Sequence, residues 1–174
     1  MLKVLGDIAE KKSYWSGLII LITGLELVAL YYQYVLDEWP CVLCIHVRLW
    51  LALLLLVAII AILANRFKKL IFSLHIIVTM TALALLERSW VLLGVERGTI
   101  FGSCDMDLGL PGWLALDKWM PFIFEVKTAC GYTPVVFLNI TMAEALLVIS
   151  ALMLIVASTL TVAMFVRIRQ QAQA

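Results

Sequence analysis

The residues best suited to chemistry are the two cysteines of the segment Pro40-Cys41-Val42-Leu43-Cys44. Two cysteines separated by two residues can close a small, reducible disulfide, and a helix N-terminus favours the thiolate, which is the reactive form. The same spacing also occurs in inert structural disulfides and in pairs of packed thiols. The motif therefore indicates thiol redox chemistry and leaves a structural role open.

Arg48 favours the redox interpretation. It follows Cys44 by four residues, so on a helix the two side chains lie on one face, about one turn apart. An arginine near the centre of a bilayer costs roughly 2.5 to 3.5 kcal/mol, which makes an intramembrane charge a candidate for function. The guanidinium would stabilise a thiolate at Cys44. The alternative is that Arg48 extends its long side chain to the lipid headgroups.

Cys104 and Cys130 form a second candidate pair. A disulfide between them would close a large loop, and a thiolate of another protein could attack it through a mixed disulfide. A purely structural disulfide is the alternative. Exchange between this pair and the first would carry electrons toward the membrane.

Two histidines and one carboxylate are further candidates. His46, inside the cysteine motif, could contact a cofactor, whereas His75 is expected to be a packing residue. Glu26 lies within an apolar run, where a carboxylate must be paired, protonated or hydrogen-bonded. Both packing against polar groups and a role in proton or quinone handling stay open for it. No metal site is predicted, because structural zinc usually uses two close-spaced cysteine pairs, and haem attachment needs C-x-x-C-H, whereas Ile45 precedes His46.

The elements that position these residues are predicted to be membrane-spanning helices. The chain is 64% hydrophobic and 14% charged, and its net charge of +1 gives no reason to expect a nucleic-acid partner. A bilayer core about 30 Å thick requires roughly twenty apolar residues of helix. Four segments meet this requirement and predict an all-α four-helix membrane bundle in a single transmembrane domain over residues 1–174: Tyr14–Val35, Cys44–Ala64, Leu70–Leu93 and Ala143–Val166.

Basic residues predict the orientation of these spans, since Lys and Arg close to a span resist translocation. The N-terminal arm, the short connection after the second span and the C-terminal tail all contain them: Lys3, Lys11, Lys12, Arg66, Lys68, Lys69, Arg167 and Arg169. Both termini are therefore expected in the cytoplasm, and segments 36–43 and 94–142 outside. All four cysteines then lie on the oxidising side, where disulfides persist.

One part of the long external loop is unusually apolar. Residues 110–126 read LPGWLALDKWMPFIFEV, which is too short and too charged to span the membrane. The segment is predicted to form an amphipathic helix that lies in the plane of the interface.

Taken together, these motifs resemble the disulfide bond formation protein B (DsbB) family of inner-membrane quinone reductases. The resemblance is carried by LELVALYYQ in the first span, PCVLCIHVR at the second, the Cys-Asp dipeptide at Cys104, WLALDKWMPFIF in the loop, and Cys130. It covers nearly the whole chain. Enzymes similar to vitamin K epoxide reductase also combine four spans with a CxxC motif, but they usually place that motif after the loop cysteines, whereas here it comes first.

The resemblance implies a relay of electrons from a periplasmic DsbA-type dithiol oxidase of the thioredoxin fold to ubiquinone or menaquinone. The partner's thiolate would attack the Cys104–Cys130 disulfide at Cys104, and Cys130 would then attack Cys41. Cys44 would be released as a thiolate beside the quinone, stabilised by Arg48, with His46 as a further contact. A membrane scaffold whose disulfides are only structural is the non-enzymatic alternative.

Overall fold

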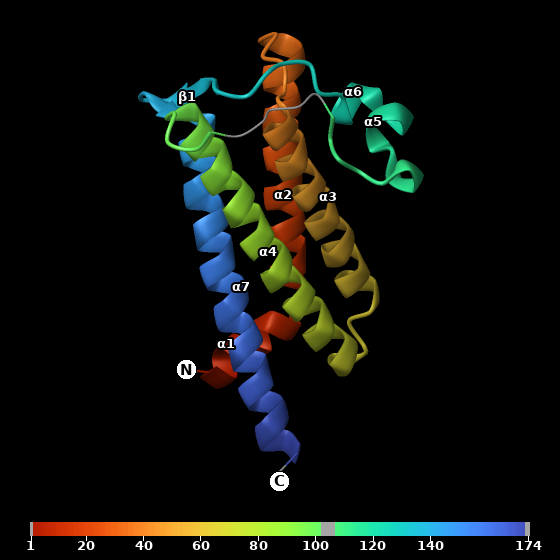
Figure 1. Cartoon of the computed structure of the whole chain (residues 1–174). Coiled ribbons are helices and arrows are strands. Elements are labelled where there is room, and N and C mark those ends of the chain that lie inside the picture. Colours follow the sequence, from red (N-terminus) through yellow and green to blue (C-terminus); the bar gives the residue numbers. More distant parts are fainter. Residues whose placement is uncertain (1, 102–106, 173–174) are drawn as a thin grey trace.

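Four long helices lie side by side and form the body of the molecule (Figure 1). The computed structural model describes residues 2–101 and 107–172. The long helices are α2 (Lys12–Val35), α3 (Val42–Leu63), α4 (Lys68–Glu96) and α7 (Met142–Ala172). Each is long and apolar enough to cross a membrane. The predicted all-α four-helix membrane bundle is confirmed.

Helices α4 and α7 are longer than the predicted spans, because a helix can continue beyond the residues that cross the hydrocarbon layer. With 29 residues, α4 is about 43 Å long, more than the roughly 30 Å of a bilayer core. Its last turn therefore extends beyond the length of a bilayer core and carries Glu96. This extra length gives the long loop before α7 a rigid support.

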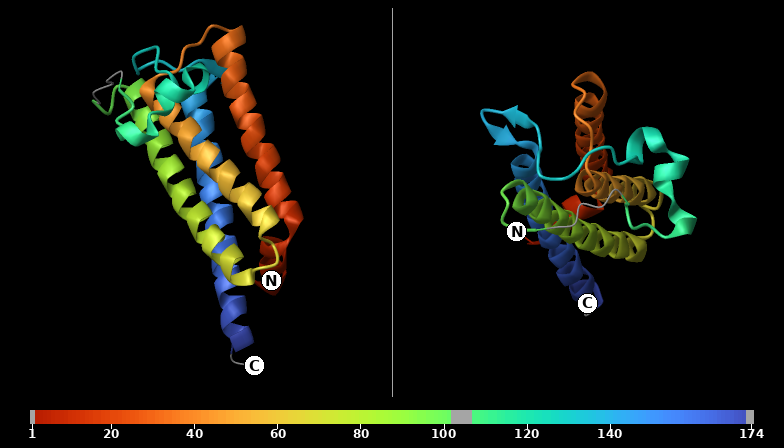
Figure 2. Two further views of the ribbon diagram at one scale, coloured as in Figure 1. Left: turned by 90° about the vertical axis from the view of Figure 1, so that its right-hand side faces the viewer. Right: turned by 45° about the horizontal axis from the view of Figure 1, so that its top comes forward.

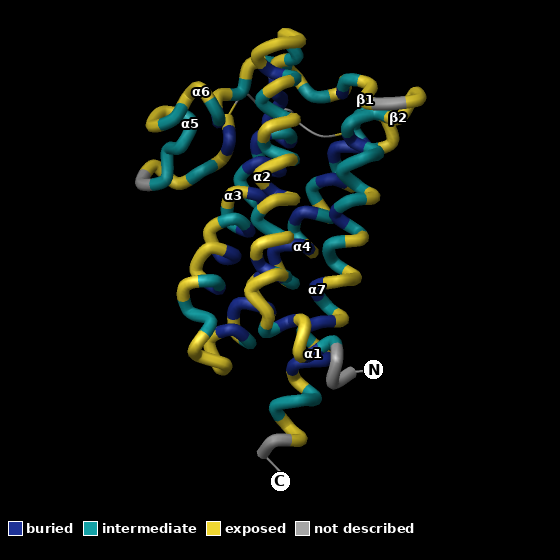
Figure 3. The backbone as a smooth tube through the Cα atoms, turned by 180° about the vertical axis from the view of Figure 1, so that it is seen from behind, coloured by how far each residue is buried: buried dark blue, intermediate teal, exposed yellow. Residues whose placement is uncertain are grey.

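The bundle packs in the order α2, α3, α4, α7, with α4 and α7 in the most extensive contact. Small buried residues such as Ala58, Ala61 and Ala157 let the backbones approach closely. Buried residues lie between the helices and exposed ones on the outside (Figure 3). Because α2 packs mainly on α3, a seam is left between α2 and α7.

Both termini lie at one end of the bundle and the long loop at the other (Figure 1). At the terminal end, the short helix α1 (Leu2–Glu10) packs on α7, where Arg167 contacts Asp7 at 2.8 Å and Glu10 at 3.4 Å. His75 is buried there between the rings of Tyr14 and Trp15. Its Nε2 lies 3.1 Å from the carbonyl oxygen of Ala9, as expected of a packing residue.

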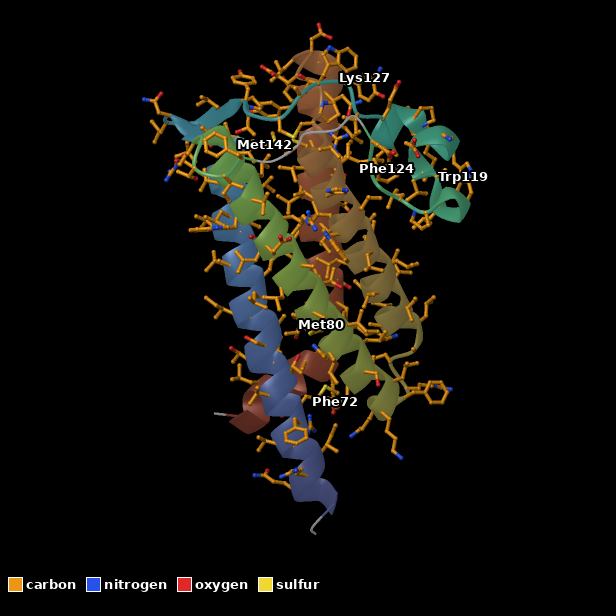
Figure 4. The ribbon with its side chains drawn as sticks, in the orientation of Figure 1. Phe72, Met80, Trp119, Phe124, Lys127 and Met142 are labelled. Atoms are coloured by element: carbon orange, nitrogen blue, oxygen red, sulfur yellow. The ribbon has the colours of Figure 1, made fainter. Side chains whose placement is uncertain are left out.

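The prediction of one amphipathic helix over residues 110–126 is wrong in its continuity. Three short elements take its place: a 3-10 turn at Gly112–Leu114, α5 (Leu116–Trp119) and α6 (Pro121–Phe124). Proline has no N–H and clashes with the preceding turn, so Pro121 can start a helix but cannot continue one. The amphipathic character remains, because Phe124 is buried and Trp119 is exposed at the outer end of the segment (Figure 4).

A small β-hairpin precedes α7 and was not predicted. Strand β1 (Val135–Phe137) pairs antiparallel with β2 (Ile140–Thr141). The hairpin and the short helices project from opposite sides of the bundle (Figure 2).

Candidate functional site

The CxxC motif lies at the N-terminus of α3. Cys41 is the N-cap residue, and its sulfur accepts a hydrogen bond of 3.3 Å from the backbone N–H of Cys44. The two sulfurs lie 2.7 Å apart and are not joined by a disulfide. Cys41 is buried, whereas Cys44 is partly exposed. This geometry suits a pair that alternates between dithiol and disulfide.

The surroundings of Cys41 favour its thiolate. The hydrogen bond from the Cys44 thiol lowers the pKa of Cys41 to about 7, and backbone N–H groups at the helix start act in the same direction, although burial opposes them. A thiol with a pKa near neutrality is both a competent nucleophile and a good leaving group in disulfide exchange.

Arg48 lies one turn deeper on α3 and is buried. Its guanidinium donates to the side-chain oxygen of Gln33 at 2.5 Å, to the carbonyl oxygen of Ala29 at 3.0 Å and to that of Ile123 at 3.0 Å. The first two acceptors belong to α2 and the third to α6. Arg48 therefore does not extend to the headgroups but connects α3 with α2 and with the loop segment that carries α6.

Gln33 completes this network and was missed by the sequence analysis. Its side chain is fully buried, and its amide nitrogen donates to the carbonyl oxygen of Phe122 at 3.4 Å. The hydroxyl of Tyr34 donates to the same carbonyl oxygen. A lone amide in an apolar span was the available signal, since such a group must find a partner.

Cys44 and Arg48 line one cavity of about 270 Å³ on the seam between α2 and α7. Its other walls are apolar and come from α2, α3, β1 and α7: Leu25, Val28, Ala29, Val47, Leu51, Val136, Met142, Ala145, Leu146 and Ile149. The structure thus brings together the thiol and the cation that were predicted to cooperate.

The second cysteine pair lies only partly within the described residues. Cys130 is disulfide-bonded and packs against the hydrophobic cluster that contains Cys41. The preceding loop is held in place because the Lys127 N–H donates to the carbonyl oxygen of Pro40 at 3.1 Å and the Lys127 ammonium lies over the ring of Trp39. Its predicted partner, Cys104, lies outside the described residues.

His46 lines a different cavity from Cys44. A helical turn of 3.6 residues places residue 46 on nearly the opposite face of α3 from residues 44 and 48. There its Nε2 lies 3.0 Å from the carbonyl oxygen of Leu108, in a cavity of about 740 Å³ under the short helices. The structure does not bring His46 to the cavity of Cys44 and Arg48.

Glu26 lies on α2, seven residues before Gln33 and on the same helical face. Its Oε1 is buried without a hydrogen-bond partner, and its charge interacts with that of Arg48. Glu26 is therefore electrostatically connected to the site without lining the cavity.

A four-span membrane bundle with a thiol pair at a helix start, a buried guanidinium beside it and a disulfide-bonded cysteine packed nearby defines a class of membrane thiol proteins. The model of the family "Disulfide bond formation protein DsbB" matches residues 11–160. The chain belongs to this family of disulfide-forming oxidoreductases.

Curated relatives named disulfide bond formation protein B match over nearly their whole length. The protein from Photorhabdus laumondii is 30% identical over 166 residues, which cover 95% of this chain and 98% of the relative. That from Sodalis glossinidius is 30% identical, with 95% and 94% covered. The Yersinia enterocolitica protein is 29% identical, with 96% and 95% covered.

The Arg48 network predicts a large loss of stability on its removal. Arg48→Met should lower the free energy of unfolding by about 3 kcal/mol, because the buried amide of Gln33 and the Ile123 carbonyl lose their donor. The matched control is Arg88→Met, because Arg88 forms a partly exposed ion pair with Glu87, which is worth about 1 kcal/mol or less. Unfolding in detergent and proteolysis of the loop would be measured. Equal effects of the two substitutions would contradict a bridging role for Arg48.

The environment of Cys41 predicts a pH dependence. In the reduced protein, the thiolate of Cys41 should be protonated well below pH 7 and should form as the pH rises through about 7. In Cys44→Ala the midpoint should move to higher pH, because the largest cause of the lowered pKa is removed. Ultraviolet thiolate absorbance would follow both titrations, and an unchanged midpoint would show that Cys44 does not stabilise this thiolate.

Proposed function

We propose that the protein reoxidises a periplasmic dithiol oxidase of the thioredoxin fold, DsbA-like, and passes the electrons to membrane quinone. The observation that carries the proposal is that Cys44 and Arg48 line the same cavity, on the seam between α2 and α7. A dithiol oxidase with a reduction potential of about −120 mV can be reoxidised only by an acceptor of higher potential. A lipid-soluble quinone is such an acceptor and can reach this cavity from the bilayer.

The residues of the cavity fit a quinone. A quinone ring needs apolar walls and a hydrogen-bond donor for its carbonyl oxygens, and this cavity offers aliphatic side chains beside Arg48. Three hydrogen bonds use part of the N–H donors of the guanidinium, which leaves others for a ligand oxygen. Ubiquinone and menaquinone share this chemistry.

The proposed relay starts at the loop disulfide. A thiolate of the partner attacks Cys104 and displaces Cys130 as a thiolate, which attacks Cys41 of the Cys41–Cys44 disulfide and releases Cys44. The partner's second thiol displaces Cys104 and leaves the partner oxidised. Cys104 then attacks Cys130, which restores the loop disulfide and releases Cys41.

The relay ends at α3. The Cys41–Cys44 disulfide re-forms as the two thiols lose two electrons and two protons, for which quinone, when bound, would be the acceptor. Arg48 stabilises the Cys44 thiolate from one turn below. Burial of Cys41 limits the access of unrelated thiols to its sulfur.

The relay requires both cysteine pairs on the periplasmic side of the inner membrane and both termini in the cytoplasm. The positive-inside rule supports this orientation, since Lys68, Lys69, Arg167 and Arg169 lie at the same end of the bundle as the termini (Figure 1).

A turnover assay tests the proposal directly. Purified protein in detergent would receive reduced dithiol oxidase and a soluble ubiquinone analogue, and quinone absorbance would be followed. The intact protein should consume quinone, and Cys44→Ser should not, because no disulfide can re-form at α3. An intact, folded protein that consumes no quinone with a competent partner would favour a scaffold with structural disulfides.

The position of the quinone predicts a specific effect of cavity filling. Ala145→Leu should raise the KM for quinone several-fold while the KM for the partner stays unchanged, because residue 145 lines the cavity of Cys44 and Arg48. Ala52→Leu is the matched control, since Ala52 lines the cavity of His46. If Ala52→Leu were the harmful substitution, the quinone would bind on the other face of α3.

A further inference from the structure

The β-hairpin before α7 exposes a group of apolar side chains. Val135 and Ile140 are exposed, and Leu138 at the turn is 79% exposed. The turn lies at the end of the hairpin, which projects beyond the side of the bundle (Figure 2). Exposure of neighbouring large aliphatic groups in water is unfavourable, so a partner of low polarity is expected for this surface.

The sequence around the hairpin contains no charge. No Asp, Glu, Lys or Arg occurs from Thr128 to Ala143. The short-helix segment on the other side of the bundle, by contrast, combines its apolar residues with Asp117, Lys118 and Glu125. An uncharged, aliphatic surface offers a protein partner no charged group for recognition, but it suits the interfacial layer of a bilayer.

The backbone conformation of the turn also indicates that the apolar side chain of Leu138 makes a favourable contact. Leu138 and Asn139 have φ values of 46° and 65°, the left-handed region that two-residue hairpin turns require. Asparagine and glycine adopt this region readily, whereas a leucine is strained by its Cβ atom. Placing the most exposed aliphatic side chain of the hairpin at a strained position is unfavourable unless that side chain gains an apolar contact.

The hairpin continues into a membrane-spanning helix. Strand β2 ends at Thr141, and α7 begins at Met142, whose N–H donates to the carbonyl oxygen of Pro134 at 2.9 Å. Figure 4 shows Met142 at the loop end of α7. The outer face of α7 exposes aliphatic side chains further along: Val148, Leu152, Ile155, Val156 and Val162. The exposed apolar side chains of the hairpin are therefore followed along the chain by those of a helix long and apolar enough to cross a membrane.

We propose that the hairpin is a membrane anchor, with Leu138, Val135 and Ile140 inserted into the interfacial layer of the bilayer. Its pairing satisfies the backbone groups between its strands, which makes insertion into a layer of low polarity tolerable. Together with the short helices on the opposite side, it holds the external loop against the membrane at two places.

The base of the hairpin is fixed to the protein. The hydroxyls of Thr133 and Thr141 donate to one carboxylate oxygen of Glu96 at 2.7 and 3.2 Å. Arg97 and Glu144 form an ion pair of 2.6 Å beside them. Attachment of the base to α4 and of the turn to lipid would hold Val136 over the cavity of Cys44 and Arg48. This last consequence rests on the proposed function, whereas the membrane contact does not.

A photo-crosslinking experiment tests the anchor. The photoreactive residue p-benzoylphenylalanine would replace Leu138 in the full-length protein, reconstituted into nanodiscs of phosphatidylcholine and phosphatidylglycerol. The matched control has the same residue at Tyr132, which is 65% exposed and donates a hydrogen bond to Glu38 at 3.3 Å. After illumination, mass spectrometry should find several-fold more phospholipid adduct at position 138 than at position 132.

A second pair of variants tests whether the apolar turn causes the insertion. With the photoreactive residue at Ile140, Leu138→Asp should reduce the lipid adduct several-fold, whereas Leu138→Met should preserve it. Equal amounts of lipid adduct at positions 138 and 132 would overturn the anchor. So would a residue at position 138 that crosslinks to an added thioredoxin-fold partner and not to phospholipid. The readout requires no turnover, so failure of the quinone assay would leave this result interpretable.

Discussion

The burial of one guanidinium in an apolar layer is the constraint on which the rest of the site depends. A charge at the depth of Arg48 is tolerated only when its N–H groups find acceptors, because lipid offers none. Gln33, Ala29 and Ile123 supply those acceptors from two separate parts of the chain. The charge beside the thiol pair therefore also fixes α2, α3 and the loop that carries α6 relative to one another.

The position of the thiol pair follows from this constraint. Because Cys44 is one turn before Arg48, it lies in the first turn of α3, near the end of the apolar span. Cys41, at the cap of the helix, faces the hydrophobic cluster against which Cys130 packs. Cys44 packs against the same cluster and also lines the cavity on the seam between α2 and α7, which Cys41 does not reach. A helix start suits this pair because residues i and i+3 lie on one face, close enough for the two sulfurs to meet.

The apolar composition of each segment was enough to predict the four spans, whereas contacts between distant segments and one local helix break were missed. Four apolar runs predicted the helices, because each span satisfies its own backbone and needs no partner to form. The role of Gln33 depends on its contacts with Arg48 and with the loop, and the hydropathy of its own span does not identify these partners. The continuous helix over residues 110–126 failed because its apolar pattern was given more weight than Pro121, which sets the break locally. The separation of His46 from Cys44 could have been predicted, since two residues along a helix turn the side chain away.

Helical periodicity also explains why one helix can serve two purposes. On one face of α3, Cys44 and Arg48 line the cavity on the seam between α2 and α7. On the other face, His46 and the apolar residues around it meet the loop segment that carries the short helices. The loop is bound to both faces, by the Ile123 carbonyl at Arg48 and the Leu108 carbonyl at His46. Since Cys130 belongs to that loop, its attachment to two faces of α3 limits how far this cysteine can move from Cys41. The proposed thiol exchange would require such a short distance.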